Sequence, residues 1–428
     1  MNIKKYTPAM PMTMPSFIEL ITSKVGREYK PAVACAAFPA LAVYADGLTF
    51  RHVDNRLHEA TFMNLLIAPT GIGKGCVDDP VKQILSDVQR RDDANRERER
   101  QWKEKCEGTA STKERPPRPT DLVIQHISSD TTYAAFVKRM EEAQGKYLYT
   151  HVNEIEDLAR MRNSTGRSWI YQVILNAFDN ARCGQERVGI TSVSAQPQTR
   201  WAFNASTTIG KGQLFFRGQT TTGALSRVSL STIEAPRFAD IPVFGDYDEE
   251  FAAQLSVYIE RLKNHPKGEV TCHAARELIR GIISDARDNA RATDNEAYFE
   301  LSKRAAVIAY LKAMVLYILE GEWNELIADF VQWSFEYDMC VKMKLFGEEA
   351  QRDFANVALG NAPIPTSLVK LDELPDLFTR EDYLERRKLH GQSTTGDTWG
   401  TIRVWKRRGC IVQNEDGTYS KTLAIGQN

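Results

Sequence analysis

The stretch Leu65-Leu66-Ile67-Ala68-Pro69-Thr70-Gly71-Ile72-Gly73-Lys74-Gly75 decides how this chain is organised. Its apolar half predicts a buried strand, a short turn-prone loop follows, and the residues through Ile84 predict a helix. Loops in this setting bind phosphate, because backbone N–H groups and the start of the helix point at the anion while a lysine neutralises its charge. Gly71 and Gly73 let the backbone approach the phosphates, and Lys74 is the candidate cation.

This loop departs at two positions from the usual phosphate-binding pattern, which is Gly-x-x-x-x-Gly-Lys followed by Ser or Thr. Ala68 stands at the first glycine, and Gly75 stands where a hydroxyl would bind Mg²⁺. Without that hydroxyl the loop would hold Mg²⁺ through water, hydrolyse slowly, or bind nucleotide without turning it over. An ordinary glycine-rich turn is the alternative, but the apolar strand and the Pro-Thr-Gly-x-Gly-Lys core favour a site for ATP with Mg²⁺. The residues predicted to bind the nucleotide are Pro69, Thr70, Gly71, Ile72, Gly73, Lys74, Gly75 and Cys76.

The chain has 428 residues, which suggests two or three domains. Its 42% apolar and 26% charged residues are typical of a soluble globular protein, and a net charge of −1 means that any DNA contact needs a local basic patch. The seven cysteines are scattered, with no C-x-x-C pair and no neighbouring histidine spacing, so they indicate neither a zinc site nor a disulfide framework. The N-terminus lacks a signal-peptide pattern, and the apolar stretch Val307 to Leu319 is too short to span a bilayer. We therefore expect a cytoplasmic protein without membrane contact.

Composition shifts along the chain predict its regions. Between residues 87 and 118 both charge signs recur at helical spacing, which predicts a solvated helical excursion held by i,i+4 charge pairs. A nucleic-acid arm is the alternative there, although the acidic residues nearly cancel the basic ones. Residues 346 to 372, which include Gly360-Asn-Ala-Pro-Ile-Pro, predict a linker. The predicted regions are a helical preface at 1–60, an α/β P-loop NTPase core at 61–250, a helical bundle or lid at 251–350, and a winged-helix-like domain at 373–428.

Polar residues end two further predicted strands. The strand from Lys146 ends in Asn153-Glu154, where a P-loop fold places its magnesium-site residues and its catalytic carboxylate. Glu154 is the candidate general base that polarises the attacking water, and Asn153 and Glu154 are expected to contact Mg²⁺ through water. The next strand ends near Asn204, which we expect to contact the γ-phosphate, with Ser206 or Thr207 as alternatives. The alternative is that these polar side chains only form hydrogen bonds with the backbone at the end of the strand.

Two arginines follow the third strand, Arg217 after Gln-Leu-Phe-Phe and Arg227 after Gly-Ala-Leu-Ser. An arginine delivered across a subunit boundary stabilises the charge that develops on the γ-phosphoryl group, at a gain of about 10³–10⁵ in rate. Arg227, which precedes a Val-Ser-Leu-Ser strand, is the first candidate for that role and Arg217 the second. The alternative is that each arginine has only a structural role.

The last region reads as two helices followed by a two-stranded ribbon, the order of a winged helix. Thr379 and Asp382 form a capping box at the first helix, and Asn414-Glu-Asp-Gly-Thr predicts the hairpin turn. A basic cluster near the end of the second helix suits contacts with DNA phosphates, although winged helices also bind proteins. The predicted DNA-binding residues are Arg403, Lys406, Arg407 and Arg408.

Over residues 15 to 340 the chain resembles a family of uncharacterised prokaryotic P-loop proteins carried by mobile elements and phages and described as primase-associated or helicase-like. The shared motifs are the preface ending in Ala-Leu-Ala-Val-Tyr, the loop Ala68 to Lys74, Ser129-Asp-Thr-Thr, Asn153-Glu154, and Gly223-Ala-Leu-Ser-Arg227. The resemblance implies a RecA-like or AAA+-like core that works on DNA during replication or transfer of an element. It also implies a homo-oligomer, with a hexamer as one form, and a primase or another replication protein as partner. The family has Ser or Thr after the lysine and Asp before the acid, so Gly75 and Asn153 depart from it.

Three functions are compatible with these residues. The first is an ATP-dependent DNA-handling motor or loader, and the second is a nucleotide-gated DNA-binding switch or origin-binding regulator with weak or no hydrolysis. Gly75 and Asn153 are the residues that decide between the two. A metabolic kinase is the third, and the winged-helix-like tail argues against it.

Overall fold

The computed structural model describes residues 7–107, 116–159, 169–189, 192–234, 240–358, 371–389, 400–407 and 410–422. The chain divides into two compact units, one that ends at Phe354 and one that begins at Ala355, and each is described by itself. Both helices and strands are present, with a parallel sheet in the first unit, as the sequence predicts. Within the described ranges, no helix has both the length and the apolar character needed to cross a bilayer.

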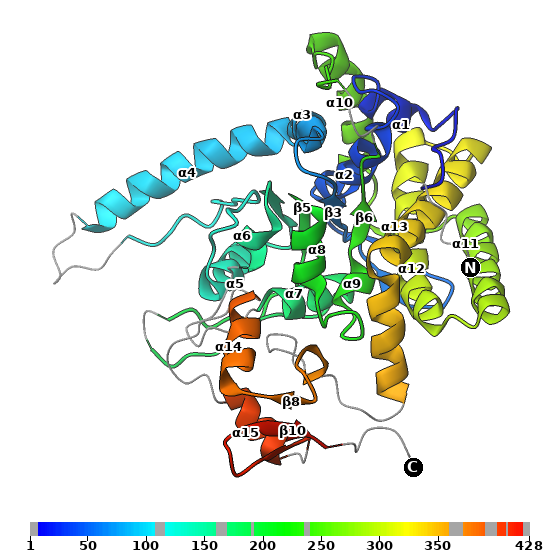
Figure 1. Ribbon diagram of the computed structural model, residues 1–428. Helices are drawn as coiled ribbons and strands as arrows, with labels where there is room; N and C mark the ends of the chain where they lie inside the picture. The colour runs from blue at the N-terminus through cyan, green and yellow to red at the C-terminus, as the bar shows by residue number, and fades with distance from the viewer. Residues whose placement is uncertain are drawn as a thin grey trace. The chain divides into compact units, whose positions relative to one another are not determined.

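A four-stranded parallel sheet forms the centre of the first unit (Figure 1). Its order is β4-β5-β3-β6, so the strand that leads into the glycine-rich loop is internal. All residues of β3 and β5 are buried, as expected of parallel strands covered on both faces. Beyond β4, an isolated parallel bridge joins His126 to Tyr149. The strands are β3 (Met63–Ile67), β4 (Leu148–Val152), β5 (Trp201–Thr207) and β6 (Ser229–Ser231).

The helix α2 (Lys30–Ala42) packs on this sheet against β3, β5 and β6. Its many alanines allow the helix backbone to lie close to the strands, and the carbonyl oxygen of Ala36 accepts a 2.8 Å hydrogen bond from the side chain of Asn204 in β5. The shorter α1 (Ser16–Ile21) precedes it. The predicted preface therefore shares a hydrophobic core with the sheet.

The preface is helical only as far as α2. It continues as a hairpin of β1 (Leu48–Arg51) and β2 (Leu57–His58), and β1 also pairs in parallel with β7 (Gly268–Val270) from the region predicted as a lid. The predicted preface, core and lid all lie in the first compact unit.

Four long helices make up the rest of the first unit's core. The most buried is α12, in which Lys312 is 2% exposed and donates to the hydroxyls of Ser229 and Ser334. Gly321 ends this helix with φ of +87°, a left-handed conformation that glycine adopts readily. The linker predicted at 346–372 is wrong in its first part, because α13 continues to Ala358. The helices are α10 (Glu249–Lys263), α11 (His273–Thr293), α12 (Glu296–Glu320) and α13 (Glu325–Ala358).

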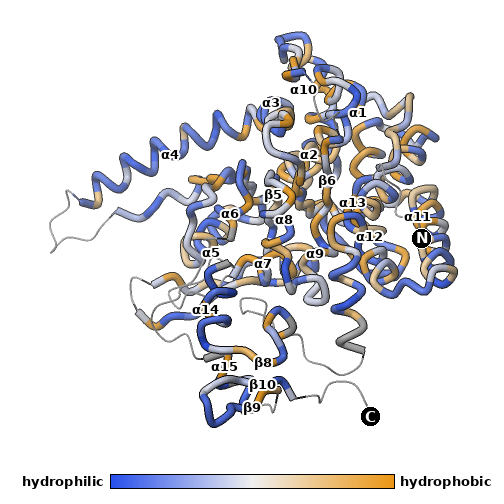
Figure 2. Tube along the Cα trace, viewed as in Figure 1, coloured by the Kyte–Doolittle hydropathy of each residue, from blue (hydrophilic) through white to orange (hydrophobic). Residues whose placement is uncertain are grey.

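The charged segment forms one long helix, α4 (Ser86–Glu107), which leads away from the sheet and is hydrophilic along its length (Figures 1 and 2). One of its faces is anchored to the returning chain. Asp92 accepts hydrogen bonds from the backbone N–H groups of Gln125 and His126, and Glu99 binds Arg139 at 2.6 Å. Burial raises the pKa of Glu99, but hydrogen bonds from Arg139 and then Arg118 lower it to about 2.

Short elements connect the strands of the sheet. Thr132 caps the helix after the bridge by accepting from the N–H of Ala135, as its Ser-Ser-Asp-Thr-Thr sequence predicts. The connecting elements are η1 (Lys74–Val77), α3 (Asp78–Ile84), α5 (Tyr133–Glu142), α6 (Ile155–Ala159), α7 (Ile170–Phe178), α8 (Ile209–Phe216) and α9 (Ala224–Arg227).

The second unit has a three-stranded antiparallel sheet of order β8-β10-β9. The capping box of Thr379 and Asp382 is confirmed, with the N–H of Thr379 donating to Asp382 at 2.7 Å. The predicted hairpin turn is also confirmed, since the N–H of Asn414 donates to the carbonyl of Thr418. The third strand, β8, was not predicted. The elements are η2 (Leu371–Glu373), β8 (Leu377–Phe378), α14 (Arg380–Leu389), α15 (Gly400–Arg407), β9 (Ile411–Gln413) and β10 (Tyr419–Lys421).

Candidate functional site at the carboxyl edge of the parallel sheet

The glycine-rich loop leaves the carboxyl end of β3 and lies at the surface. Residues 69 to 71 are exposed, and Gly71 and Gly73 have φ of +74° and +87°, a region that residues with a Cβ rarely adopt. The Nζ of Lys74 donates a 3.1 Å hydrogen bond to the carbonyl oxygen of Pro69. The lysine is therefore already directed across the loop that would hold a phosphate.

One side of the loop is packed and the other is open. A Cβ on Gly73 would lie 2.7 Å from Cγ of Pro242 and 3.3 Å from Cε1 of Tyr29, whose ring packs edge-on against Phe244. A Cβ on Gly71 would meet nothing within 4 Å. The packed side fixes the loop, and the open side leaves room for a ligand.

A carboxylate lies beside the position that lacks the hydroxyl. A Cβ on Gly75 would be 3.4 Å from Oδ2 of Asp78, and Oδ1 of Asp78 lies 3.0 Å from Nε2 of His151 on β4. The hydroxyl of Tyr149 contacts the other ring nitrogen of this histidine at 3.2 Å. Mg²⁺ prefers oxygen ligands, so Asp78 offers a suitable donor near the missing hydroxyl. Sequence analysis did not find Asp78, although it lies only three residues after Gly75. Its contact with His151, 73 positions away, is formed only in the fold.

Asn153 and Glu154 follow β4 at the same edge of the sheet, and both are exposed. Glu154 is 48% exposed and pairs with Lys211 on α8, whose Nζ lies 3.0 Å from Oε2 of Glu154 and 2.7 Å from Glu156. Hydrogen bonds to Glu156 and then Glu154 raise the pKa of Lys211. The lysine, which sequence analysis missed, neutralises the carboxylate that was predicted to polarise water.

Asn204 is not at a strand end. β5 continues to Thr207, and Asn204 lies in the middle of that strand at 2% exposure. Its side-chain N–H₂ donates to Tyr149 and to α2, and its Oδ1 accepts from Asn64. These partners occupy the amide, so the expected contact between Asn204 and the γ-phosphate does not fit the structure.

The alternatives to Asn204 lie nearer the loop. The Ser206 hydroxyl donates to the carbonyl of Asn153 at 2.8 Å and so joins the ends of β5 and β4. The Thr207 hydroxyl is buried without a hydrogen-bond partner in the described part of the chain, while the carbonyl of Thr207 accepts from the N–H of Ala68. Ser206 and Thr207 therefore tie β5 to its two neighbours where the loop begins.

The two predicted arginines lie in different settings. Arg227 precedes β6, at the amino edge of the sheet, and its guanidinium is bound to Asp179 at 2.6 Å with only 10% of the side chain exposed. Burial and this ion pair do not suit an arginine that must reach a neighbouring subunit. Arg217 follows α8 and is half-buried at the side of a groove.

No protein-family model matches the chain, and no curated protein matches it. The site is therefore judged on its own geometry.

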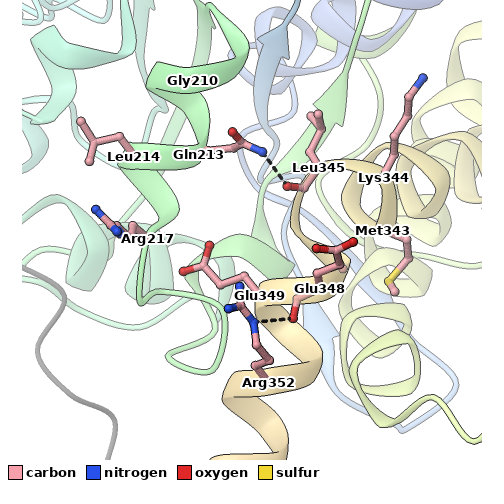
Figure 3. Close-up of a pocket in the computed structure, with 11 residues that line it drawn as sticks. Gly210, Gln213, Leu214, Arg217, Met343, Lys344, Leu345, Glu348, Glu349 and Arg352 are labelled. Atoms are coloured by element: carbon pink, nitrogen blue, oxygen red, sulfur yellow. Dashed lines mark hydrogen bonds between the residues drawn. The ribbon is translucent and has the colours of Figure 1, made fainter. Parts of the chain in front are cut away.

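The groove beside Arg217 lies between α8 and α13 and has a volume of about 500 Å³ (Figure 3). Gln213 donates across it to the carbonyl of Leu345 at 3.1 Å. Arginine, lysine and glutamate side chains alternate along it, which is typical of a solvated contact between helices. The groove is lined by Gly210, Gln213, Leu214, Arg217, Met343, Lys344, Leu345, Gly347, Glu348, Glu349 and Arg352.

In the second unit, Arg403 and Lys406 are exposed on α15, while Ile402 and Trp405 of the same helix are buried in the unit's core. The Nζ of Lys406 donates to Gln413 on β9 at 2.7 Å. The side chain of Arg407 and all of Arg408 lie outside the described residues.

Proposed function

We propose that the chain is an ATP-dependent DNA-handling protein, a helicase-like motor or loader built on a P-loop NTPase core. The observation that carries this proposal is the convergence of the loop and the acid on one edge of the sheet. β3, β5 and β4 are adjacent and parallel, so Lys74 and Glu154 follow strand ends on the same side. In open α/β sheets ligands bind at the carboxyl ends of the strands.

Each residue at this edge has a proposed role. Lys74 pairs with the outer phosphates of ATP, and the N–H groups of the loop donate to them. Asp78 stands in for the missing hydroxyl as an oxygen ligand to Mg²⁺, and Asn153 contacts the ion through water. Bound Mg²⁺ supplies charge neutralisation on the phosphates. Glu154 accepts a proton from the attacking water once Lys211 has moved away.

The second unit is the proposed DNA contact. Two helices and a small antiparallel sheet support a winged helix, and Arg403 and Lys406 lie one helical turn apart on its exposed side. Contacts of this kind are with phosphates and are independent of sequence, so binding should weaken as salt rises. Arg407 and Arg408, the other two predicted DNA-binding residues, follow directly in the sequence.

The proposed assembly is a homo-oligomer, with a hexamer as one form, that works beside a primase or another replication protein of a mobile element. Its support is the resemblance in the loop, the Asn153-Glu154 pair and the segment ending in Arg227. Since Arg227 is held by Asp179, Arg217 is the better candidate for a residue that completes a neighbouring site.

A second candidate function is a nucleotide-gated DNA-binding switch. Two observations favour it, namely Gly75 in place of the hydroxyl and the ion pair that Lys211 makes with Glu154. A switch would bind ATP tightly and release phosphate slowly, because the acid stays neutralised.

Phosphate release from ATP, with and without single- or double-stranded DNA, separates the two functions. We expect DNA to stimulate turnover and Glu154→Gln to reduce it by about 10²–10⁴-fold while ATP stays bound. Glu141→Gln, at an exposed glutamate of α5, is the matched control. Unchanged turnover in Glu154→Gln would remove that residue from the mechanism.

If ATP binds and wild type releases no phosphate under any of these conditions, the chain is a switch. Lys211→Met then tests whether the ion pair with Glu154 is what prevents hydrolysis. Turnover that appears only in this variant would identify the ion pair as the block.

A further inference from the structure

A cluster of metal-ligating side chains lies in the hairpin between β1 and β2, away from the loop. His52 directly follows β1, His58 is the last residue of β2, and Asp54 lies in the turn. The pairing of Phe50 with His58 fixes the register, and the N–H of His52 donates to the carbonyl of Arg56 to close the turn. The ligand atoms of the two histidines and the aspartate all lie within 4.8 Å of one another.

The two imidazoles are buried, and most of their nitrogens lack a partner. His52 is 4% exposed and His58 is 8% exposed. Nδ1 of His52 lies 3.1 Å from Oδ1 of Asp54, while the other three ring nitrogens have no hydrogen-bond partner among the residues described. Buried polar groups are nearly always satisfied, so three unsatisfied nitrogens in one place point to a missing partner.

Aromatic packing fixes the rings. The ring of His52 lies edge-on to Tyr310 of α12, with centroids 5.4 Å apart, and the ring of His58 lies edge-on to Phe178 of α7 at 6.4 Å. The Tyr310 hydroxyl also donates to the carbonyl of Arg51 at 2.9 Å. Two separate helices therefore hold the nitrogens in place before any ligand binds.

Charged residues of both signs lie near the rings. Arg276 and Arg56 add positive charge, while Asp54 and Asp179 add negative charge.

We propose that His52, Asp54 and His58 bind one divalent transition-metal ion, of which Zn²⁺ is the best match. Two imidazole nitrogens and one carboxylate oxygen form a common ligand set for Zn²⁺, whereas Mg²⁺ and Ca²⁺ favour oxygen ligands throughout. Asp54 is 48% exposed, so water can reach the cluster to complete the coordination. The cysteine pattern gave no sign of such a site, because no cysteine takes part.

This site is separate from the proposed nucleotide site. His58 precedes β3 and lies toward the amino edge of the sheet, while the glycine-rich loop leaves β3 at the carboxyl edge. The five residues of β3 alone span roughly 16 Å at about 3.3 Å per residue. A bound ion would close the 52–58 turn and stiffen the chain that enters β3.

The test uses the full chain, stripped of metal with a chelator, dialysed and kept free of nucleotide. Titration with Co²⁺ should produce visible d–d absorption that saturates at one equivalent, and Zn²⁺ should displace the colour. His52→Gln and His58→Gln should each weaken Zn²⁺ binding by at least about 100-fold, more than the loss of an outer-shell partner causes. The control is His265→Gln, at a half-buried histidine outside the cluster whose loss should leave binding unchanged.

The wild-type titration needs no variant, so it decides the question even if the substitutions unfold the chain. Wild type that takes up no Co²⁺ or Zn²⁺ would overturn the proposal. So would folded His58→Gln protein, verified by circular dichroism, that keeps the wild-type affinity and spectrum.

Discussion

The two edges of the parallel sheet use the same kinds of residue in opposite ways. At the carboxyl edge, Lys74 and Glu154 are accessible and lie beside an open loop. At the amino edge, Arg200 forms a double hydrogen bond with Glu59, and Arg227 is bound to Asp179. We propose that charged residues at the first edge exchange their partners for a ligand, while those at the second stabilise the fold. Residue type alone does not separate the two uses, but burial and partners do.

The largest expected effect on stability is at Asn204, between the two edges. Asn204→Ala leaves the buried amide of Asn64 and the carbonyl of Ala36 without their partner. We expect the free energy of unfolding to fall by about 3 kcal/mol, because unsatisfied buried groups cost roughly 1–3 kcal/mol each. Chemical denaturation measures this, with the exposed Asn264→Ala as control. A stable Asn204→Ala protein that had lost ATP turnover would restore the γ-phosphate role instead.

The next effect concerns Arg227 at the amino edge. Arg227→Ala should lower the free energy of unfolding by about 2 kcal/mol, since it removes a charged hydrogen bond and the packing of a side chain that is only 10% exposed. Turnover per folded molecule should stay unchanged. Arg100→Ala, which breaks an exposed pair with Glu97, should cost less than about 1 kcal/mol. A fall in turnover of about 10³-fold or more in folded Arg227→Ala oligomers would show that this residue acts on a neighbouring site.

The smallest effect is expected at Gly75 on the carboxyl edge. Gly75→Ser adds the hydroxyl of the usual pattern, and its Cβ would meet Asp78 at an ordinary contact distance of 3.4 Å. If Asp78 already supplies an oxygen ligand, the new hydroxyl should change the Mg²⁺ concentration needed for ATP binding only a few-fold, on the order of 1 kcal/mol. Asp78→Asn should raise that concentration more than Gly75→Ser lowers it. A large gain from Gly75→Ser together with no effect of Asp78→Asn would show that Asp78 has no such role.

The sequence was most informative where the evidence was local. A buried strand, two glycines and a lysine identified the loop, and the capping box of Thr379 and Asp382 was visible within four residues. The end of β5 was predicted near Asn204, three residues too early. The sequence Asn-Ala-Ser-Thr gives no sign that the strand continues to Thr207. In the same way, the polar character of the chain after Phe346 hid the continuation of α13.

Other features could not be read from the sequence because they join distant segments. Asp78 meets His151 across the sheet, and Lys211 reaches Glu154 from the helix after the next strand. The pairing of β1 with β7 joins the predicted preface to the predicted lid. The histidines at 52 and 58 are close in sequence, but only their burial reveals them as a cluster.

The central claim is that the carboxyl edge binds a nucleoside triphosphate through Lys74. Equilibrium binding of ATP with Mg²⁺, measured by calorimetry on wild type, Lys74→Ala and Lys82→Ala, tests it most directly. Lys82 is the matched control, because it is an exposed lysine of α3 that forms an ion pair with Asp79 of the same helix. We predict that Lys74→Ala weakens ATP binding by about 10–100-fold, because a hydrogen bond to a charged group contributes roughly 1.5–3 kcal/mol. Lys82→Ala should leave the affinity unchanged. Equal affinity in all three proteins, or no binding to wild type, would contradict the claim.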